Sequence, residues 1–335
     1  MIDLRPVGTS GMEVAPIALG GNVFGWTADE ETSFRLLDAF VDAGGTMIDT
    51  ADVYSAWAPG HVGGESERVI GAWLKRDPAK RANIVIATKV GFLDGKIEPT
   101  KAAKYDGKVD KGEYVASLDP AVIARGADAS LKRMGIDTID LYYQHRDNPE
   151  VPLADSLGAF EELRQAGKIR ATGLSNFEPA RVEEALAVAH DGGFDPAVAV
   201  QGWYNLVERG KYEDSLQDVV TGRGLSFFSF YSLANGFLTG KYRSKDDLGK
   251  SVRGLRNAEY VDSDKGRRVL AALEAVAGET KAELATVALA WTKARPGIAA
   301  PIASATSERQ LDQLIAALSL NLSTAQIALL DEASA

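Results

Sequence analysis

The sequence predicts an α/β fold, a (β/α)8 TIM barrel with an N-terminal hairpin and an extra helix between the seventh strand and the seventh helix. Short apolar runs rich in β-branched residues alternate with helix-length amphipathic segments along the whole chain, and there are eight of each. Strands joined by helices build parallel sheets, and eight such units close into a barrel. The pattern alone leaves an open doubly wound sheet as the alternative.

The predicted strands are the short apolar runs, and the predicted helices are the segments whose apolar residues recur at helical spacing. The strands are Ala15–Gly21, Thr46–Asp52, Ile84–Val90, Thr138–His145, Ile169–Asn176, Ala197–Asn205, Leu225–Leu233 and Ile298–Ser304. The helices are Thr32–Ala43, Glu65–Arg76, Pro120–Met134, Leu153–Ala166, Pro179–His190, Tyr212–Thr221, Ala282–Arg295 and Glu308–Leu318. No linker divides these elements, so residues 1–335 are expected to form a single domain.

Five segments depart from the bare repeat. Leu4–Val14 contains a Ser-Gly turn between two short runs and predicts a hairpin that covers the barrel floor. Polar insertions at Gly91–Leu118 and Lys241–Asp262 follow the third and seventh strands, so they are expected over the C-terminal mouth, where barrel active sites lie. Lys265–Ala277 is the extra helix, and the segment after the eighth helix has the pattern of one more short helix.

Composition excludes several classes of function. The net charge is −10 and no basic run is present, which argues against a nucleic-acid partner. The chain has no cysteine, so disulfides and thiolate metal sites are excluded. It has no apolar stretch long enough to cross a membrane and no signal-peptide pattern, so a soluble, cytoplasmic protein is expected. Nothing in the sequence indicates the oligomeric state.

Common catalytic and cofactor motifs are missing or incomplete. The Rossmann spacing G-x-G-x-x-G does not occur, and neither does the G-x-S-x-G nucleophile elbow. Two segments that resemble a phosphate-binding loop, one beginning at Gly91 and one at Gly236, are one residue too short and lack the Ser or Thr after lysine. The three histidines, His61, His145 and His190, have no metal-binding spacing, so no metal is expected.

Four hydrophilic residues occupy the ends of strands, where burial should be greatest: Asp49, Tyr54, Lys89 and His145. Each has an ordinary structural explanation, such as a loop cap, a lysine that reaches solvent, a packed ring or a core histidine. Their concentration at one end of successive strands is harder to explain that way. A buried lysine there needs a counter-ion, and Asp49 is the candidate.

These four residues suit the reduction of a carbonyl group, which needs a hydride on carbon and a proton on oxygen. We predict that Tyr54 is the general acid, because an adjacent ammonium lowers the pKa of a phenol. Lys89 would tune that pKa, and Asp49 would hold Lys89 charged and in place. His145 would donate a hydrogen bond to the carbonyl oxygen and polarise it.

The chain resembles the aldo-keto reductase family from about Val7 to Leu330, and most closely its bacterial branch near the potassium-channel β-subunit-like group. The motifs that carry the resemblance are Ile-Asp-Thr-Ala-Asp-Val-Tyr in strand two, Gly-Gly-Glu-Ser-Glu, Thr-Lys in strand three and Gln-His in strand four. Gly-Leu-Ser-Asn-Phe, Val-Gln-Gly-Trp-Tyr-Asn and Gly-Phe-Leu-Thr-Gly-Lys-Tyr follow in order.

The resemblance implies a nicotinamide dinucleotide as cofactor. It implies that Ser175, Asn176 and Gln201 bind the carboxamide, that Asp49 lies near the ribose and that Phe230 stacks on the ring. Pyrophosphate contacts are implied for the loop Tyr231–Gly236 with Lys241 and Arg253, and adenosine contacts for the start of the eighth helix. The complete implied set is Gly21, Asn22, Asp49, Ser175, Asn176, Gln201, Phe230, Tyr231, Ser232, Leu233, Ala234, Gly236, Lys241, Arg253, Ser304, Thr306, Arg309, Gln310 and Gln313.

Two departures from the family pattern bear on cofactor choice. Leu314 stands where the family often has Asn. Many NADP-binding members have Lys or Arg near the position of Ser304, and this sequence does not. Arg309 remains available for a 2′-phosphate. NADP(H) is therefore the expected cofactor, with NAD(H) as the alternative.

The substrate pocket is expected to be aromatic, lined by Phe24, Trp26, Trp57 and Trp203, with Asn22 nearby. No long loop follows the eighth helix, so Gly91–Leu118 is the candidate lid. The resulting hypothesis is an NADP(H)-dependent oxidoreductase that reduces aldehydes, ketones or sugar-like carbonyls. The alternative is a cofactor-sensing regulatory subunit with little turnover, although His145 favours catalysis. A metal-dependent lyase or hydrolase is disfavoured by the shortage of ligands.

Overall fold

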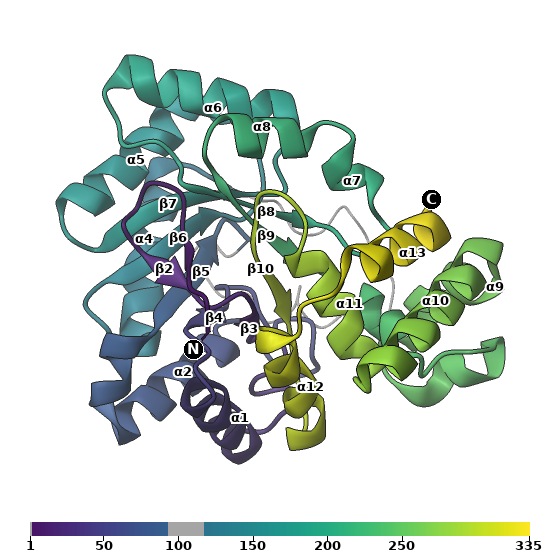
Figure 1. The fold of residues 1–335 in the computed structure, drawn as a ribbon. Helices are drawn as coiled ribbons and strands as arrows, with labels where there is room; N and C mark the ends of the chain where they lie inside the picture. The colour runs from purple at the N-terminus through teal and green to yellow at the C-terminus, as the bar shows by residue number, and fades with distance from the viewer. Residues whose placement is uncertain (1, 93–116) are drawn as a thin grey trace.

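The computed structural model describes residues 2–92 and 117–335, and its centre is a closed barrel of eight parallel strands (Figure 1). Around the barrel the order is β10–β3–β4–β5–β6–β7–β8–β9, and β10 pairs with β3 to close it. The barrel strands are β3 Ala18–Gly20, β4 Met47–Asp49, β5 Val85–Val90, β6 Ile139–Gln144, β7 Ile169–Ser175, β8 Ala199–Trp203, β9 Ser226–Phe230 and β10 Ile298–Ala303. The predicted barrel is confirmed, and the open sheet is excluded.

Helices surround the barrel as an outer ring (Figure 1). The α-helices are α1 Glu30–Asp42, α2 Glu65–Arg76, α4 Pro120–Met134, α5 Leu153–Gln165, α6 Pro179–Gly192, α7 Gly210–Glu213, α8 Leu216–Gly222, α9 Ala258–Asp262, α10 Asp264–Thr280, α11 Leu284–Lys293, α12 Glu308–Ser319 and α13 Thr324–Ser334. The 3-10 helices are η1 Pro78–Asn83, η2 Ala234–Thr239, η3 Lys245–Lys250 and η4 Gly254–Asn257. The predicted extra helix is α10, and the terminal helix α13 packs against it.

Several predicted strands extend past the observed ones, and one predicted helix is divided in two. The single helix predicted for Tyr212–Thr221 is wrong, because the backbone leaves helical geometry at Ser215, which separates α7 from α8. The strand predicted for Leu225–Leu233 stops at Phe230, since Tyr231 takes a left-handed conformation with φ +53°. In both places the apolar spacing continues across the break, so the pattern gives no sign of it.

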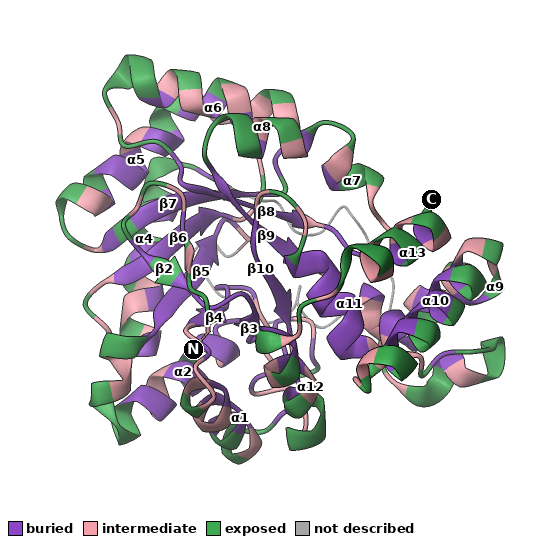
Figure 2. Ribbon diagram, viewed as in Figure 1, coloured by how far each residue is buried: buried purple, intermediate pink, exposed green. Residues whose placement is uncertain are grey.

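The hydrophobic core has two layers, which Figure 2 shows as buried strands and inward helix faces. Along β5, Ile86 and Val90 point outward and pack with the helices, whereas Val85 and Ala87 point into the barrel. This alternation is the period-2 pattern of a strand. Lys89 continues the inward face of Val85 and Ala87, so the fold aims its side chain into the barrel interior.

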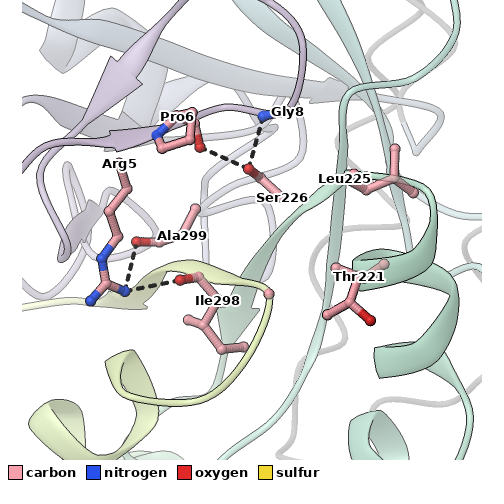
Figure 3. Close-up of a pocket in the computed structure, with 11 residues that line it drawn as sticks. Arg5, Pro6, Gly8, Thr221, Leu225, Ser226, Ile298 and Ala299 are labelled. Carbon is pink, nitrogen blue, oxygen red and sulfur yellow. Dashed lines mark hydrogen bonds between the residues drawn. The ribbon is translucent and has the colours of Figure 1, made fainter.

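The N-terminal hairpin of β1 Arg5–Pro6 and β2 Glu13–Val14 lies at the end of the barrel where the strands begin, near the first residues of β9 and β10. Arg5 Nη1 donates to the carbonyl of Ile298 at 2.9 Å. Ser226 Oγ accepts from Gly8 N at 2.9 Å and donates to Pro6 O at 2.8 Å (Figure 3). A pocket of about 280 Å³ lies between these groups. The predicted hairpin at the barrel floor is therefore present and tied to two strands.

Lys293, in the last turn of α11, is buried, and its Nζ donates to the last carbonyls of α12, Ala317 O at 2.8 Å and Leu318 O at 3.1 Å. Burial, together with the charge of Arg5, lowers the pKa of this ammonium to about 8. The folded chain therefore binds fewer protons than the unfolded chain between about pH 8 and the ordinary lysine pKa of 10.5.

We expect the free energy of unfolding of the wild type to rise relative to that of Lys293→Met as the pH increases through this window. Urea denaturation of both proteins at several pH values measures the difference. A difference that stays constant from neutral pH to pH 10 would show that burial does not perturb this lysine.

Candidate active site

Asp49 and Lys89 form a buried ion pair at the C-terminal ends of β4 and β5. Their side chains are 2% and 1% exposed, and Lys89 Nζ lies 2.8 Å from each carboxylate oxygen. The same ammonium donates to Thr50 O at 2.7 Å and to the Tyr54 hydroxyl at 2.9 Å. A buried charge is tolerated only when it is paired and hydrogen-bonded, and these contacts meet that condition.

Tyr54 lies on a turn after β4 and not within the strand, because β4 ends at Asp49 and the predicted strand to Asp52 is too long. Its hydroxyl donates to Asp49 Oδ2 at 3.1 Å while accepting from Lys89. Burial, followed by the negative charge of Asp49, raises the pKa of Tyr54 well above its ordinary value. The prediction that Lys89 lowers this pKa is therefore wrong here, because burial and the charge of Asp49 raise it. The phenol keeps its proton.

His145 follows β6 at the same end of the barrel. Its ring centroid lies 6.3 Å from that of Tyr54, and the edge of Phe92 packs on it at 4.6 Å. Burial, and then the charges of Lys89 and Arg146, lower the pKa of His145 well below its ordinary value, so the imidazole is neutral. Its buried Nδ1 has no hydrogen-bond partner among the described residues. A neutral imidazole in this place can donate one hydrogen bond to a ligand.

Three uncharged polar side chains cluster at the ends of β7 and β8: Ser175, Asn176 and Gln201. Ser175 and Gln201 are register partners, and Asn176 N donates to Gln201 O at 3.0 Å. Asn176 Nδ2 donates to Ser175 Oγ at 3.0 Å and to the carbonyl of His145 at 3.0 Å. Gln201 Nε2 donates to Asp49 Oδ1 at 2.8 Å, which joins this cluster to the ion pair. The predicted carboxamide site and the predicted catalytic residues thus form one connected network.

Aromatic rings gather beside this network at the ends of β8 and β9. The ring centroid of Tyr231 lies 4.9 Å from Trp203 and 5.2 Å from Phe230. An ionised Tyr231 would raise the pKa of Tyr54, which indicates that the two hydroxyls lie near each other. The sequence indicated Phe230 alone as a stacking ring, and in the structure a second ring, that of Tyr231, lies next to it.

The loop after β9 carries a run of left-handed backbone. The residues with positive φ are Tyr231 (53°), Ala234 (46°), Asn235 (53°) and Gly236 (94°). Such conformations cost free energy at non-glycine positions and cluster at ligand sites. Ser232 Oγ donates to Ser229 O at 2.9 Å, and Leu233 and Ala234 pack toward the core. A Cβ on Gly236 would lie 3.0 Å from Lys241 Nζ, so this exposed ammonium lies against the loop.

The residues predicted at the adenosine end are near one another, between the ends of β3 and β10 and the start of α12. Ser304 Oγ donates to Asn22 Oδ1 at 2.7 Å. The side chain of Gln310 accepts from Thr306 N at 2.8 Å, so a ligand at that amide would have to displace it. Two further predicted residues lie in the first two turns of α12, one exposed and one half-buried: Arg309 and Gln313.

Two predicted residues, Trp26 and Trp57, form an aromatic wall beside Tyr54. The ring centroids of Trp26 and Trp57 are 5.6 Å apart, and Trp57 lies 6.0 Å from Tyr54. Arg253 stacks its guanidinium over Trp26 at 5.5 Å. The prediction that Phe24 lines the substrate pocket is wrong, because its side chain is fully buried in the hydrophobic core.

The Gly-Gly-Glu-Ser-Glu motif has a structural role at the start of α2. Ser66 Oγ donates to Gly21 O at 2.8 Å. A Cβ at position 21 would lie 2.8 Å from Ser66 Oγ, which is too close, so position 21 requires glycine. Glu67 is fully buried, accepts from Thr88 Oγ1 at 2.6 Å and pairs with Arg133. These bonds fasten α2 to β5 directly behind Lys89.

Sequence reasoning missed Thr50, Phe92 and Arg146. Thr50 contributes only a backbone carbonyl, which no side-chain pattern reveals. Phe92 and Arg146 lie in different loops, and Arg146 stacks over the Phe92 ring at 5.4 Å. Both residues closely follow the ends of predicted strands, and this position was the one signal that could have indicated them. Most of the candidate lid Gly91–Leu118 lies outside the described residues.

Within residues 2–92 and 117–335, no three His, Cys, Asp or Glu side chains are grouped so that they could hold a metal ion. In the same ranges, no helix combines the length and the apolar character that crossing a membrane requires.

Comparison with known proteins gives the family. The model of the Aldo/keto reductase family matches residues 16–335. An oxidoreductase of Bacillus subtilis (strain 168), YrpG, is 33% identical over 317 residues, which cover 94% of this chain and 91% of that protein. The aldo-keto reductase yakc of Schizosaccharomyces pombe, named with NADP(+), is 29% identical over 310 residues, covering 91% of this chain and 83% of that protein.

A probable voltage-gated potassium channel subunit beta of Oryza sativa subsp. japonica is 28% identical over 319 residues, covering 94% of this chain and 90% of that protein. The relatives thus include both oxidoreductases and a channel subunit, as the motifs indicated. Since the family model spans nearly the whole sequence, this chain belongs to the aldo/keto reductase family.

Proposed function

We propose that this protein is an NADP(H)-dependent carbonyl reductase that acts on aldehydes, ketones or sugar-like carbonyls. The observation that carries the proposal is the Tyr54 hydroxyl 2.9 Å from a buried ammonium and 3.1 Å from its counter-ion, at the C-terminal end of a parallel barrel. Membership of the aldo/keto reductase family supports it. Active sites of this barrel lie at that end.

The residues present fit a nicotinamide dinucleotide. Ser175, Asn176 and Gln201 offer neutral donors and acceptors, which complement an uncharged carboxamide. The left-handed loop Tyr231–Gly236, with Lys241 against it, offers backbone amides and a cation for a pyrophosphate. When bound, such a cofactor supplies or accepts the hydride.

Tyr54 has the role of general acid. Its raised pKa keeps the proton on Oη at neutral pH, where it can pass to the oxygen of the carbonyl as that oxygen becomes negative. The phenolate left behind lies 2.9 Å from Lys89 Nζ, whose positive charge stabilises it. Lys89 therefore acts after the proton has moved, and Asp49 holds Lys89 in position.

His145 has a positioning and polarising role at the same oxygen. Its lowered pKa keeps it neutral, so it donates a hydrogen bond without competing with Tyr54 as the proton source. The Phe92 edge and the Asn176 contact to its backbone carbonyl restrict where the ring lies. Trp57 packs beside Tyr54, and Trp26 packs against Trp57, so aromatic rings cover this side of the phenol.

The choice between NADPH and NADH is expected to depend on Arg309, which is exposed in the first turn of α12. The NADP(+) in the name of the fission yeast relative supports NADPH. Titration of the protein with each reduced cofactor by fluorescence quenching, followed by assay of an aldehyde panel with the tighter cofactor, tests the proposal. Tight cofactor binding with negligible turnover would support the alternative, a cofactor-sensing subunit, to which the channel-subunit relatives point.

Phe230 tests the stacking part of this proposal. Replacing it with leucine removes a ring at the end of β9, and we expect the Kd for NADPH to rise roughly 2- to 10-fold. Phe230→Tyr keeps a ring and should retain the affinity. If Tyr231→Leu weakens binding and Phe230→Leu does not, the stacking ring is Tyr231.

A further inference from the structure

The first residue after β9, Tyr231, has a backbone conformation that is unfavourable for an aromatic residue. Its φ of +53° lies in the left-handed region, which residues other than glycine adopt rarely and at a cost. Such a conformation persists only where the surrounding contacts enforce it. The direction of the Tyr231 ring, beside Trp203 and Phe230, therefore depends on those contacts.

Asn205 makes one of these contacts from the turn after β8. Its side chain is fully buried, and its Nδ2 donates to Tyr231 O at 3.0 Å. The same carbonyl accepts from Ala234 N at 2.7 Å, the bond that closes the turn after β9. Asn205 Oδ1 accepts from Val207 N at 2.9 Å and from Glu208 N at 3.0 Å. One side chain thus joins the two turns.

The other end of Tyr231 is held as well. Arg256 Nη1 donates to the Tyr231 hydroxyl at 3.3 Å, and the Trp203 ring packs on the Tyr231 ring with their centroids 4.9 Å apart. Since the carbonyl and the hydroxyl are both bonded, the ring has few orientations available. A ring that is already oriented loses less conformational entropy when a ligand binds, so its orientation contributes to affinity.

An ion pair anchors the segment that carries Asn205. Arg209 Nη2 lies 2.7 Å from Glu213 Oε2, and both side chains are 19% exposed. Glu213 Oε1 accepts a hydrogen bond from the hydroxyl of Tyr204, the residue directly before Asn205. The turn after β8 is therefore fastened to α7 immediately before the residue that contacts Tyr231.

The anchor continues into α13. Arg209 Nη1 donates to Asp331 O at 3.0 Å and to Ser334 Oγ at 3.1 Å. The Asp331 carboxylate also accepts from Trp291 Nε1 at 2.9 Å and pairs with Arg295 at 3.0 Å. Helix α13 lies on the outside of the barrel, where it packs on α10 (Figure 1). Because each buried charge must keep its partner, this network favours one arrangement of the segment.

We infer that Asn205 is a positioning residue for the ring of Tyr231, and that α13 holds the segment of Asn205 in place through Arg209. The inference rests on the proposed binding of a nicotinamide cofactor beside that ring. It makes cofactor affinity depend on a helix outside the barrel, through the direct contacts of residues 204–213.

The test is a double-mutant cycle with the Kd for NADPH, measured by fluorescence quenching, as the readout. Asn205→Ala should raise this Kd about 5-fold, and Tyr231→Leu should raise it by a similar factor. In the Tyr231→Leu protein, Asn205→Ala should add less than about 2-fold, because Asn205 acts through the ring. An equal effect of Asn205→Ala with and without the ring shows a purely structural role and overturns the inference.

Asn205→Asp is the narrower variant, and it serves if Asn205→Ala does not fold. Its carboxylate can still accept from Val207 N and Glu208 N, but it has no hydrogen to donate to Tyr231 O. Its Kd should rise as in Asn205→Ala. Ser226→Ala is the matched control, because buried Ser226 fastens the beginning of the same strand, β9, to the hairpin. Its loss should leave the Kd unchanged.

Arg209→Met tests the role of α13. Loss of the guanidinium should raise the Kd for NADPH about 3-fold. Arg164→Met is the matched control, because Arg164 is also a half-buried arginine paired with a nearby glutamate, Glu161 in α5. This variant should keep the wild-type Kd. Equal Kd values in the two variants overturn the part of the inference that concerns α13.

Hydrogen exchange without cofactor separates this inference from the proposed function. Asn205→Ala should speed the exchange of backbone amides in residues 231–236, whose turn depends on the Tyr231 carbonyl, and should leave α4 unchanged. If NADPH and NADH both fail to bind the wild type, the cofactor proposal fails, and the exchange alone decides whether Asn205 positions Tyr231. Unchanged exchange in residues 231–236 overturns the inference in either case.

Discussion

Replacing Tyr54 with phenylalanine should lower kcat for aldehyde reduction by about 10²- to 10⁴-fold, the usual contribution of a positioned general acid. The substitution removes one oxygen that accepts from Lys89 and donates to Asp49, and leaves the ring in place. Lys89 keeps both carboxylate oxygens and Thr50 O as partners, so the ion pair should survive. Single-turnover oxidation of NADPH measures the effect on the chemical step.

Tyr142→Phe is the control for this substitution. Tyr142 is buried in the outer core, and its hydroxyl has no hydrogen-bond partner in the described part of the chain. Its replacement should leave the rate unchanged. The Kd for NADPH should be similar in the Tyr54 variant and in the wild type. A Tyr54→Phe protein with more than a tenth of wild-type kcat would remove Tyr54 as the proton source.

Replacing Lys89 with methionine should destabilise the fold by about 3–5 kcal/mol and abolish measurable turnover. Among the residues that the structure describes, the substitution leaves the buried Asp49 carboxylate with only Tyr54 and Gln201 as partners, and an uncompensated buried charge carries a cost of that size. The same change also removes the charge that stabilises the Tyr54 phenolate. Urea denaturation measures the first effect and steady-state kinetics the second.

A second substitution separates stability from catalysis. In Asp49→Asn/Lys89→Met the unpaired charge is gone, so the double variant should be about 1–3 kcal/mol more stable than Lys89→Met alone and still inactive. Lys168→Met removes an exposed lysine paired with Asp128 and should change stability by less than about 0.5 kcal/mol. If Lys89→Met denatures at the wild-type urea concentration, the buried pair is not a determinant of the fold.

The barrel was predictable because apolar residues recur with different spacings in strands and in helices. The strict alternation of strands with helices then leaves few possible folds. Breaks inside an element were not, since the apolar positions around Ser215 suit one helix as well as two. Asp49 and Lys89 were found because a charged side chain on the inward face of a strand has few explanations. The direction of the pKa shift of Tyr54 was not predicted correctly. The sequence indicates Lys89 and Asp49 as its neighbours but does not show that both lie within hydrogen-bonding distance of its hydroxyl.

Residues that meet only in space escaped prediction for the same reason. Phe92 and His145 follow different strands, and nothing in either segment indicates that their rings touch. The cations at the mouth were visible in the sequence, but the aromatic rings beneath them, such as Trp26 under Arg253, appear only in the fold.

The central claim is that the phenol of Tyr54 holds its proton until a carbonyl oxygen takes it. Ultraviolet absorbance, recorded against pH for the wild type and for Tyr54→Phe, isolates the ionisation of this one tyrosine among the ten in the chain. The account predicts no phenolate signal from Tyr54 at or below its ordinary pKa of 10. A difference spectrum showing one phenolate near neutral pH would contradict it.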